Sequence, residues 1–301
     1  MAPSIGFIIV SHNFNKEQPL ILRLLDKLEQ FNNAFTVIHH DFSKTPFAED
    51  EIKKYKAAFV KPHIVTSWAT WPVVIATLQA MKTLVQHKPD VEWFILLSAN
   101  DYPVKSVEYI ESFFKNAPHD AFIQQTLINK QVYNENKQLN NFLKYSYLKL
   151  FSFHATVPFI SKKGSFYKRP FFIPKPSFLQ MFNEKFKCFI GEQWFMGNRR
   201  VLDFFNKNAY EDTAFGKFCS TNKICPDNIF FHSLIGNNKD FSVSNEIYRY
   251  IDWSKSSNWH PNTLTIEDYS KIEESEALFA RKFDYFNSRE LMDHIDKEKF
   301  S

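Results

Sequence analysis

The feature that most constrains this chain is a series of apolar segments that each end in polar residues. The first, "IGFIIVSH" at residues 5–12, is a continuous apolar run, as expected of a parallel strand buried on both faces. Three further segments share the pattern: "AFTVIHHD" at 34–41, "HIVTS" at 63–67 and "EWFILLSANDYPV" at 92–104. We therefore predict four strands, the last of which breaks at a polar loop.

Helical periodicity separates these strands. One segment opens at Pro19 and another at Trp71. Their apolar faces comprise Ile21, Leu24, Leu25, Leu28 and Phe31 in the first, and Val74, Ile75, Leu78, Met81 and Val85 in the second. Alternating strands and helices predict an α/β fold with a doubly wound, mostly parallel central sheet. Further along, Thr265 with Asp268 resembles a capping pair before another helix.

Polar residues gather where the predicted strands end. They occupy positions 11–13, 39–41 and 98–101. Ligands bind beyond the carboxyl ends of the strands in sheets of this kind, so this edge favours a nucleotide-like ligand. The chain has neither GxGxxG nor GxxxxGK[ST], which argues against a dinucleotide fingerprint and a P-loop.

Composition limits the partners and the compartment. The net charge of +4 is too small to argue for nucleic acid. The 34 Phe reflect core packing or, alternatively, aromatic platforms for sugar or nucleobase. Cys188, Cys219 and Cys225 lack metal spacing and indicate a reducing compartment without disulfides. No apolar run approaches the ~20 residues of a membrane span, and the N-terminus lacks a charged leader, so we expect a cytoplasmic protein.

The middle of the chain has a different character. Residues 137–183 contain no Asp or Glu, but many aromatic residues alternate with cations. The cations include Lys144, Lys149, Lys162, Lys163, Lys168, Arg169 and Lys175. They belong either to an ordinary solvated insertion or to a surface for an anionic acceptor, membrane headgroups or single-stranded nucleic acid. We predict one domain with a nucleotide-binding half at 1–124, an insertion at 125–185 and an acceptor and catalytic half at 186–301.

Several segments together resemble one family. In order, they are "FIIVSHN", "VIHHD", "FILLSANDYPVKS", "GEQWF", "PDNIFFHSL", "YIDW" and "LFARKFD". They are similar to the core-2/I-branching β-1,6-N-acetylglucosaminyltransferases and peptide O-xylosyltransferases of glycosyltransferase family 14, here as a bacterial-type member. The likeness runs from Ile5 to Asp284 and is weakest at about 125–185. It implies a GT-A-type fold, a UDP-sugar donor, inversion at the anomeric carbon and no metal or cofactor, and the chain contains no DxD triplet.

The resemblance also implies how the donor phosphates are bound. Lys282 matches the family lysine that contacts the diphosphate, and Arg281 stands beside it. Without a metal, fixed cations must neutralise the leaving group. The alternative is a solvated pair. The second family arginine falls near Asn262 and is not retained, so Arg281, His260 or a lysine of the insertion would have to compensate.

Strand-end residues match the rest of the donor site. Asp41 matches an acid that contacts the uridine, although it could equally cap the following turn. Ser98 matches a residue lining the donor pocket, and Asp101 is better suited to holding the turn that follows. The remaining donor-binding candidates are Val10, Ser11 and His12. Neighbouring strand residues face opposite sides, so His39 and His40 should not share a metal ion.

On the acceptor side, Trp253 matches a tryptophan that packs near the acceptor sugar. An aromatic floor suits the apolar face of a sugar, and a core tryptophan is the equal alternative. Trp194 lies in a segment that borders the acceptor in the family. Glu192 and Gln193 beside it could bind sugar hydroxyls.

The catalytic base is the point of departure from the family. An inverting transfer needs a carboxylate to deprotonate the attacking hydroxyl. Aligned on "FFH", the family glutamate falls at Asn228, whose amide cannot accept that proton. Asp227 could serve instead, or Glu192 could reach the site, or the chain could be a weak or inactive member. An anionic acceptor would need no base.

We therefore expect an inverting, metal-independent glycosyltransferase that moves GlcNAc or xylose from UDP to a hydroxyl of a glycan or lipid-linked glycan. The expected setting is bacterial surface polysaccharide or lipopolysaccharide synthesis, with peripheral contact at the inner face of the cell membrane and no nucleic acid partner. The alternative is an inactive member that binds nucleotide-sugar or glycan. An unrelated α/β nucleotide binder would be favoured if Lys282 lay far from the strand ends.

Overall fold

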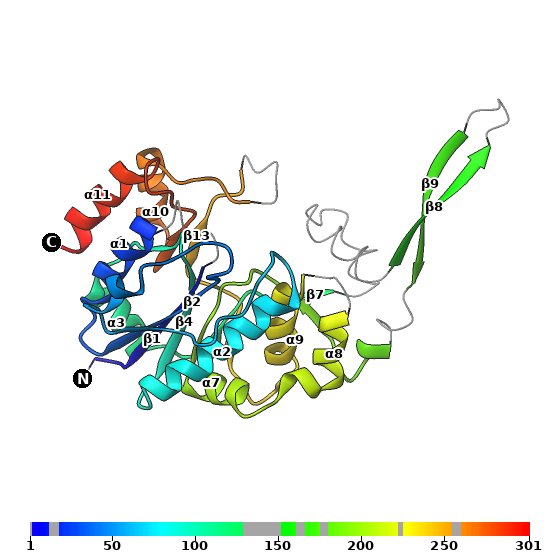
Figure 1. Cartoon of the computed structure of the whole chain (residues 1–301), viewed down its shortest axis with the longest axis horizontal. Helices are drawn as coiled ribbons and strands as arrows, with labels where there is room; N and C mark the ends of the chain where they lie inside the picture. Colours follow the sequence, from blue (N-terminus) through cyan, green and yellow to red (C-terminus); the bar gives the residue numbers. More distant parts are fainter. Residues whose placement is uncertain are drawn as a thin grey trace.

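The computed structural model describes residues 2–11, 18–128, 152–160, 166–174, 180–221, 225–254 and 260–301. Its central sheet has seven strands in the order β12-β6-β11-β4-β1-β2-β3 (Figure 1). These are β1 Ile5–Ser11, β2 Ala34–His40, β3 Ala57–Phe59, β4 Trp93–Ser98, β6 Ala121–Phe122, β11 Met196–Asn198 and β12 Val243–Ser244. Strand β1 pairs in parallel with both β2 and β4, and β11 is antiparallel to its neighbours. The predicted α/β class with a mostly parallel central sheet is confirmed.

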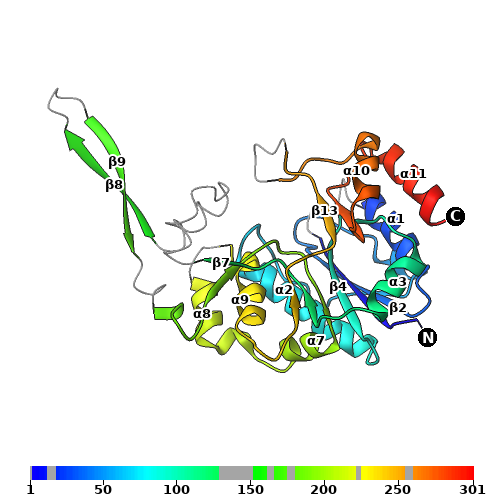
Figure 2. The same ribbon diagram turned by 180° about the vertical axis from the view of Figure 1, so that it is seen from behind.

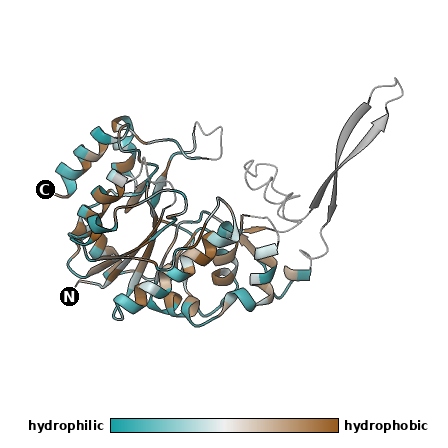
Figure 3. Ribbon diagram, viewed as in Figure 1, coloured by the Kyte–Doolittle hydropathy of each residue, from teal (hydrophilic) through white to brown (hydrophobic). Residues whose placement is uncertain are grey.

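Helices cover both faces of this sheet because its strands are apolar on both sides. Phe7 and Ile9 of β1 pack in the core with helices α1 Gln18–Leu28, α3 Val107–Lys115 and α11 Arg289–Lys299. Ile8 packs in the opposite core with α2 Trp71–His87, α7 Arg199–Asn206, α8 Ala214–Thr221 and α9 Phe230–Gly236. Figures 2 and 3 show the helices around the sheet and the hydrophobic residues gathered on its strands. Most described Phe side chains lie in these two cores, which supports core packing as the reason for their abundance.

A smaller sheet sits beyond the end of β4. It has the order β13-β14-β5, with β5 Tyr102–Pro103, β13 Arg249–Ile251 and β14 Phe279–Arg281. Because β5 begins only four residues after β4 ends, this sheet lies at the carboxyl edge of the main one. The predicted capping box of Thr265 and Asp268 is confirmed: it opens a 3-10 turn, η4 Ile266–Asp268, that leads into α10 Tyr269–Glu274.

The expected strand at 63–67 is wrong. The third strand is β3, which pairs with β2. Residues 63–67 instead bond to side chains at the end of β2. The backbone N–H of Ile64 donates to His39 Nε2 at 3.0 Å, and that of Thr66 donates to Asp41 Oδ2 at 2.7 Å. These polar side chains take the donors that a strand would have offered to a neighbour.

The predicted insertion contains β7 Thr126–Ile128, which pairs with β10 Cys188–Ile190, and an antiparallel ribbon of β8 Ser152–Ile160 and β9 Phe166–Pro174. Both views place the ribbon away from the central sheet (Figures 1 and 2). The basic side chains expected in this region lie outside the described residues.

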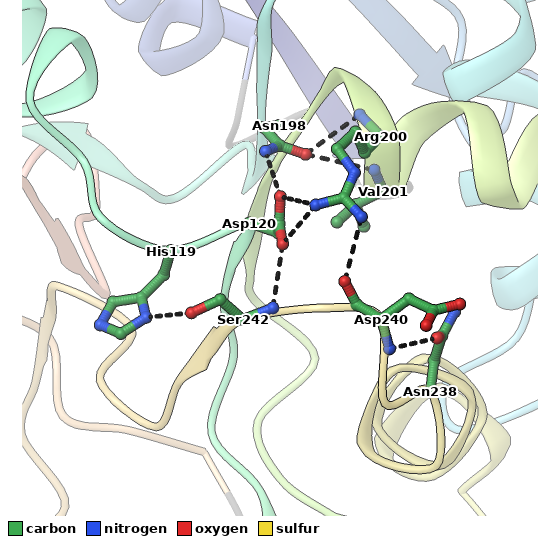
Figure 4. Close-up of polar contacts among 8 residues, drawn as sticks. All are labelled: His119, Asp120, Asn198, Arg200, Val201, Asn238, Asp240 and Ser242. Atoms are coloured by element: carbon green, nitrogen blue, oxygen red, sulfur yellow. Dashed lines mark hydrogen bonds and ion pairs between the residues drawn. The ribbon is translucent and has the colours of Figure 1, made fainter.

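A polar network stabilises the side of the main sheet formed by β12, β6 and β11 (Figure 4). Asp120 accepts hydrogen bonds from Asn198 Nδ2 at 2.7 Å, Arg200 Nη1 at 2.9 Å and the Ser242 backbone N–H at 2.9 Å. Burial alone would raise the pKa of Asp120, but the bonds from Ser242 and Asn198, with the charge of Arg200, outweigh it and lower the pKa. The network therefore joins β6, α7 and β12 through one carboxylate.

Candidate active site

The register of the main sheet brings the predicted strand-end residues together. Ser11 lies opposite His40, and Val10 lies opposite Ser98. Asp41 follows directly after β2, and its backbone N–H donates to the Ser11 carbonyl at 3.1 Å. His12 lies outside the described residues. The direction of winding changes between β1 and β4, so this edge is the position where doubly wound sheets bind ligands.

Asp41 is fully buried and already saturated with hydrogen bonds. One carboxylate oxygen accepts from the backbone N–H and hydroxyl of Ser43, at 3.1 and 2.5 Å. The other accepts from the backbone N–H and hydroxyl of Thr66, at 2.7 and 3.1 Å. Burial raises the pKa of Asp41, but the bonds from Ser43 and Thr66 prevail and lower it. Asp41 therefore caps the turn and holds the 63–67 segment, and its contact with uridine stays a prediction.

The neighbouring histidines have separate partners. His39 accepts from the Ile64 backbone, whereas His40 Nε2 donates to the Thr45 carbonyl at 2.8 Å and its Nδ1 accepts from Ser11 Oγ at 3.2 Å. Burial lowers the pKa of both, to about 4 for His39. Over the described ranges, no three His, Cys, Asp or Glu side chains gather in a way that could hold a metal ion. Metal independence stays a prediction.

Asp101 holds the turn that follows β4. Its Oδ2 accepts from the Ser98 backbone N–H at 2.6 Å and from the Ser98 hydroxyl. Its Oδ1 lies 3.1 Å from Nε of Arg249, and both of these side chains are buried. Ser98 is thus fixed in the position where the resemblance places the donor pocket.

The "FARKFD" segment is bonded directly to this turn. The Phe283 backbone N–H donates to the Asn100 carbonyl at 2.9 Å, and Asn100 Nδ2 donates to the Phe283 carbonyl at 3.0 Å. Arg281 and Lys282 are therefore held at the carboxyl end of β4. This position counts against an unrelated nucleotide binder, which was favoured only if Lys282 lay far from the strand ends.

His260 completes a cluster of basic groups. Burial lowers its pKa, and the charges of Lys282 and Arg281 lower it further, so the three groups lie within electrostatic range of one another. Asn262, at the position of the missing family arginine, instead donates to Asp252 Oδ2 at 2.6 Å. Of the compensating groups considered above, Arg281 is a cation in this cluster, whereas the lowered pKa leaves His260 mostly neutral at pH 7.

Trp194 lies beneath two guanidinium groups. The Cζ atom of Arg281 is 4.3 Å from the centre of the Trp194 ring, and that of Arg249 is 5.6 Å from it. Burial lowers the pKa of Arg249 to about 10, partly offset by Asp101. Arginine faces stack well on indole, so the ring and the two cations support one another.

Glu192 stands on the same loop, which is tightly held. Its backbone N–H donates to Gln124 Oε1 at 3.3 Å, and its carbonyl accepts from His232 Nε2 at 2.8 Å. A Cβ at Gly191 would lie 2.1 Å from the Gln124 carbonyl oxygen, so only glycine fits there. Burial raises the pKa of Glu192, and Arg281 and Arg249 oppose that shift. Gln193 follows and is half-buried.

The 3-10 turn η3 Pro226–Asn228 holds Asp227, the first base candidate, beside the loop that carries Glu192, the second. Asn228 Nδ2 donates to the Gly191 carbonyl at 2.7 Å, and the Gly191 N–H donates to the Asn228 carbonyl at 3.1 Å. Asp227 is 5% exposed, and its Oδ1 has no hydrogen-bond partner. Burial raises the pKa of Asp227 to about 7 against two backbone hydrogen bonds, and the charge of Glu192 adds to the rise.

Two tryptophans outside the regular elements are exposed. Trp253 is 43% exposed, which removes the interpretation of it as a core residue. Trp68 is 66% exposed, and its ring centre lies 6.3 Å from that of His260. The sequence reasoning did not single out Trp68 or Arg249. "TSWATW" carries no sign of which tryptophan is exposed, and the ion pair of Arg249 joins residues far apart in the chain.

No helix within the described parts of the chain is both long and apolar enough to cross a bilayer.

The site combines the sheet edge at which the direction of winding changes, a cluster of basic groups and buried acids. This arrangement suits a transferase that acts on a phosphorylated donor. The family model for the Core-2/I-Branching enzyme matches residues 5–276. The chain belongs to this family of glycosyltransferases, which act on glycans.

Individual relatives agree with this assignment. The chain is 27% identical over 300 residues to the beta-glucuronosyltransferase GlcAT14B of Arabidopsis thaliana, covering 93% of this chain and 62% of the relative. It is 25% identical over 294 residues to GlcAT14A of the same plant, covering 92% and 60%. It is 22% identical over 322 residues to human xylosyltransferase 1, covering 97% and 30%. The chain thus spans less than two thirds of the length of these relatives.

Proposed function

We propose that this protein is an inverting glycosyltransferase that moves a sugar from a UDP-sugar to a hydroxyl of a glycan, with Asp227 as the general base. The observation that carries the proposal is the environment of Asp227: a buried carboxylate with an unpartnered oxygen and a pKa of about 7. A base with that pKa is half-deprotonated at neutral pH and can still accept a proton effectively. Glu192 links it to the basic cluster, because its charge acts on both Asp227 and Arg281.

Glu192 serves less well as the base. Two arginines oppose the rise of its pKa, so they stabilise its charged carboxylate and disfavour its protonated form. Asn228 is excluded by its chemistry and is already bonded to Gly191. In the proposed reaction, Asp227 takes the proton of the acceptor hydroxyl, the oxygen attacks the anomeric carbon, and UDP leaves from the opposite face. Arg281 and Lys282 neutralise the charge that develops on the diphosphate.

The donor sugar is open among three candidates. GlcNAc and xylose follow from the resemblance, and glucuronic acid follows from the names of the two plant relatives. We further propose a role in bacterial surface polysaccharide synthesis, with peripheral membrane contact through the basic insertion. Vesicle sedimentation with anionic lipids tests that contact.

The second candidate function is a catalytically weak or inactive binder of nucleotide-sugar or glycan. The observation in its favour is the amide at the family glutamate position, which is occupied in bonding the Gly191 carbonyl. Both candidates predict binding of UDP, and only the first predicts transfer.

The first test is UDP binding by thermal shift, in Mg²⁺ and then in EDTA. Stabilisation that persists in EDTA and disappears in Lys282→Ala supports a metal-independent donor site. Lys115→Ala, at the exposed end of α3, is the matched control and should behave as wild type. No shift at millimolar UDP in either condition would remove the donor assignment. UDP release is then measured with UDP-GlcNAc, UDP-xylose and UDP-glucuronic acid in the presence of oligosaccharide acceptors, for wild type and Asp227→Asn.

A further inference from the structure

Arg249, at the start of β13, joins three parts of the site. Its side chain is only 1% exposed. Its Nη2 donates to the Leu96 carbonyl of β4 at 3.0 Å, its Nε lies 3.1 Å from Asp101 Oδ1, and its guanidinium lies over Trp194. Removing both charges of such a pair from water is costly, and apolar residues of similar size would often hold a core as well. The pair is therefore better explained by what it does to its neighbours.

Asp101 has two arginines near it, and within the described part of the chain only Arg249 forms an ion pair with it. Its Oδ2 is taken by the backbone N–H and hydroxyl of Ser98, which leaves Oδ1. Arg249 forms an ion pair with that oxygen through Nε, although the two atoms make no hydrogen bond and Arg249 Nη1 has no hydrogen-bond partner either. Arg281 also interacts with the charge of Asp101, yet no ion pair joins them within the described part of the chain, and Arg281 Nε has no hydrogen-bond partner. A buried guanidinium N–H left without an acceptor is costly, so Arg281 is disposed to accept an anion.

We propose that Arg249 is a positioning residue that occupies Asp101 and thereby leaves Arg281 available to an anionic ligand. This inference rests on the proposed function, in which that ligand is the diphosphate of the nucleotide-sugar. Arg249 does not touch the ligand. Without it, Asp101 would be an unpaired buried carboxylate, and Arg281 would be drawn toward it and away from the phosphates.

Several charged groups from different elements surround Arg281 and its neighbours. Asp101 follows β4, Glu192 stands on the 191–194 loop and Arg249 comes from β13. Lys282 follows Arg281 in the chain, and both act on His260. Of the two acids, Asp101 is the one that Arg249 neutralises by direct contact. Removing the charge of Asp101 should therefore undo the effect of removing Arg249.

The test is a double-mutant cycle on ligand affinity. We would measure dissociation constants of UDP by calorimetry, and of uridine by ligand-observed NMR, for wild type, Arg249→Met, Asp101→Asn and the double variant. Arg249→Met should weaken UDP binding on the order of 10-fold and leave uridine binding nearly unchanged, since uridine has no phosphate. The double variant should regain UDP affinity to within about threefold of wild type. If Arg249 had only a structural role, its loss would weaken the binding of UDP and of uridine together, and the double variant would bind both more weakly still.

Further variants keep the test decisive. Arg249→Lys retains the charge and should keep the ratio of UDP to uridine affinity near that of wild type. Arg249→Gln removes the charge with less loss of polarity, and it replaces Arg249→Met if that variant does not fold. Arg23→Met is the matched control: it removes an arginine paired with Asp293 and Asp296 between α1 and α11, and should leave the ratio unchanged.

Two outcomes would contradict the inference in different ways. The inference alone would be overturned if wild type binds UDP but Arg249→Met and Arg249→Gln leave the ratio of UDP to uridine affinity unchanged. It would also be overturned if the double variant does not regain UDP affinity. Failure of wild type to bind UDP at all would overturn the proposed function and this inference with it.

Discussion

Replacing Asp227 with Asn should stabilise the protein at alkaline pH while it lowers turnover. The pKa of Asp227 is raised from 3.8 to about 7. Each unit of difference between the folded and unfolded states corresponds to about 1.36 kcal/mol, so the shift of roughly three units corresponds to about 4 kcal/mol. Because the folded-state pKa is the higher one, this contribution to stability is fully present below pH 3.8. It is lost as the pH rises through about 7. An Asn side chain stays neutral as the pH rises, so the variant does not lose this contribution to stability.

Urea denaturation at a series of pH values measures the effect. At pH 8, Asp227→Asn should be more stable than wild type by up to about 4 kcal/mol, and the difference should vanish toward pH 4. The melting temperature at pH 8 should rise by roughly 5–10 °C. Turnover should fall by about 10²-fold or more, and the acid limb of the wild-type kcat/KM profile should lie near pH 7.

Asp212→Asn is the control, since it removes an exposed carboxylate of the turn η2 Tyr210–Asp212. It should give no stability difference that depends on pH over this range. If Asp227→Asn shifts stability equally at all pH values, the argument from burial fails. If its turnover matches that of wild type, Asp227 is not the base.

Three further predictions concern other parts of the molecule. Asn228→Glu removes the donor to the Gly191 carbonyl, so we expect a lower melting temperature and lower turnover; a strong rise in turnover would instead mean that the present site lacks its base. Asp120 has a lowered pKa, so its stabilising effect is present above the unfolded pKa and is lost as the pH falls through the folded one. Asp120→Asn should therefore be less stable than wild type to urea at pH 7, by a margin that narrows below about pH 4. Trp68→Ala should weaken binding of a UDP-sugar by calorimetry without changing the melting temperature, because the ring is exposed.

The parts of the site that lie at strand ends could be predicted from sequence. Buried strands show as continuous apolar runs, and polar residues mark their ends, so Val10, Ser11 and Ser98 were expected at one edge. The segment at 63–67 was misassigned because its apolar letters look like a short strand. Its backbone donors are in fact taken by His39 and Asp41, which no local pattern reveals.

The connections between distant segments could not be predicted. Arg249 reads as an ordinary strand residue in "YRYIDW", and its role depends on Asp101. The likeness of "FARKFD" to its relatives indicated a phosphate-binding segment. Its attachment to the turn after β4 became visible only through the bonds between Asn100 and Phe283.

The amide at the family glutamate position is best understood together with Asp227. Asn228 and Gly191 exchange two hydrogen bonds, which fix the loop that carries Glu192. Glu192 in turn adds its charge to the environment that raises the pKa of Asp227. An inactive binder would have no use for a buried acid whose Oδ1 lacks a hydrogen-bond partner, because such a group lowers stability. A cost of this kind is typical of catalytic residues, so the same turn that moves Asn228 away from catalysis favours Asp227 as its replacement.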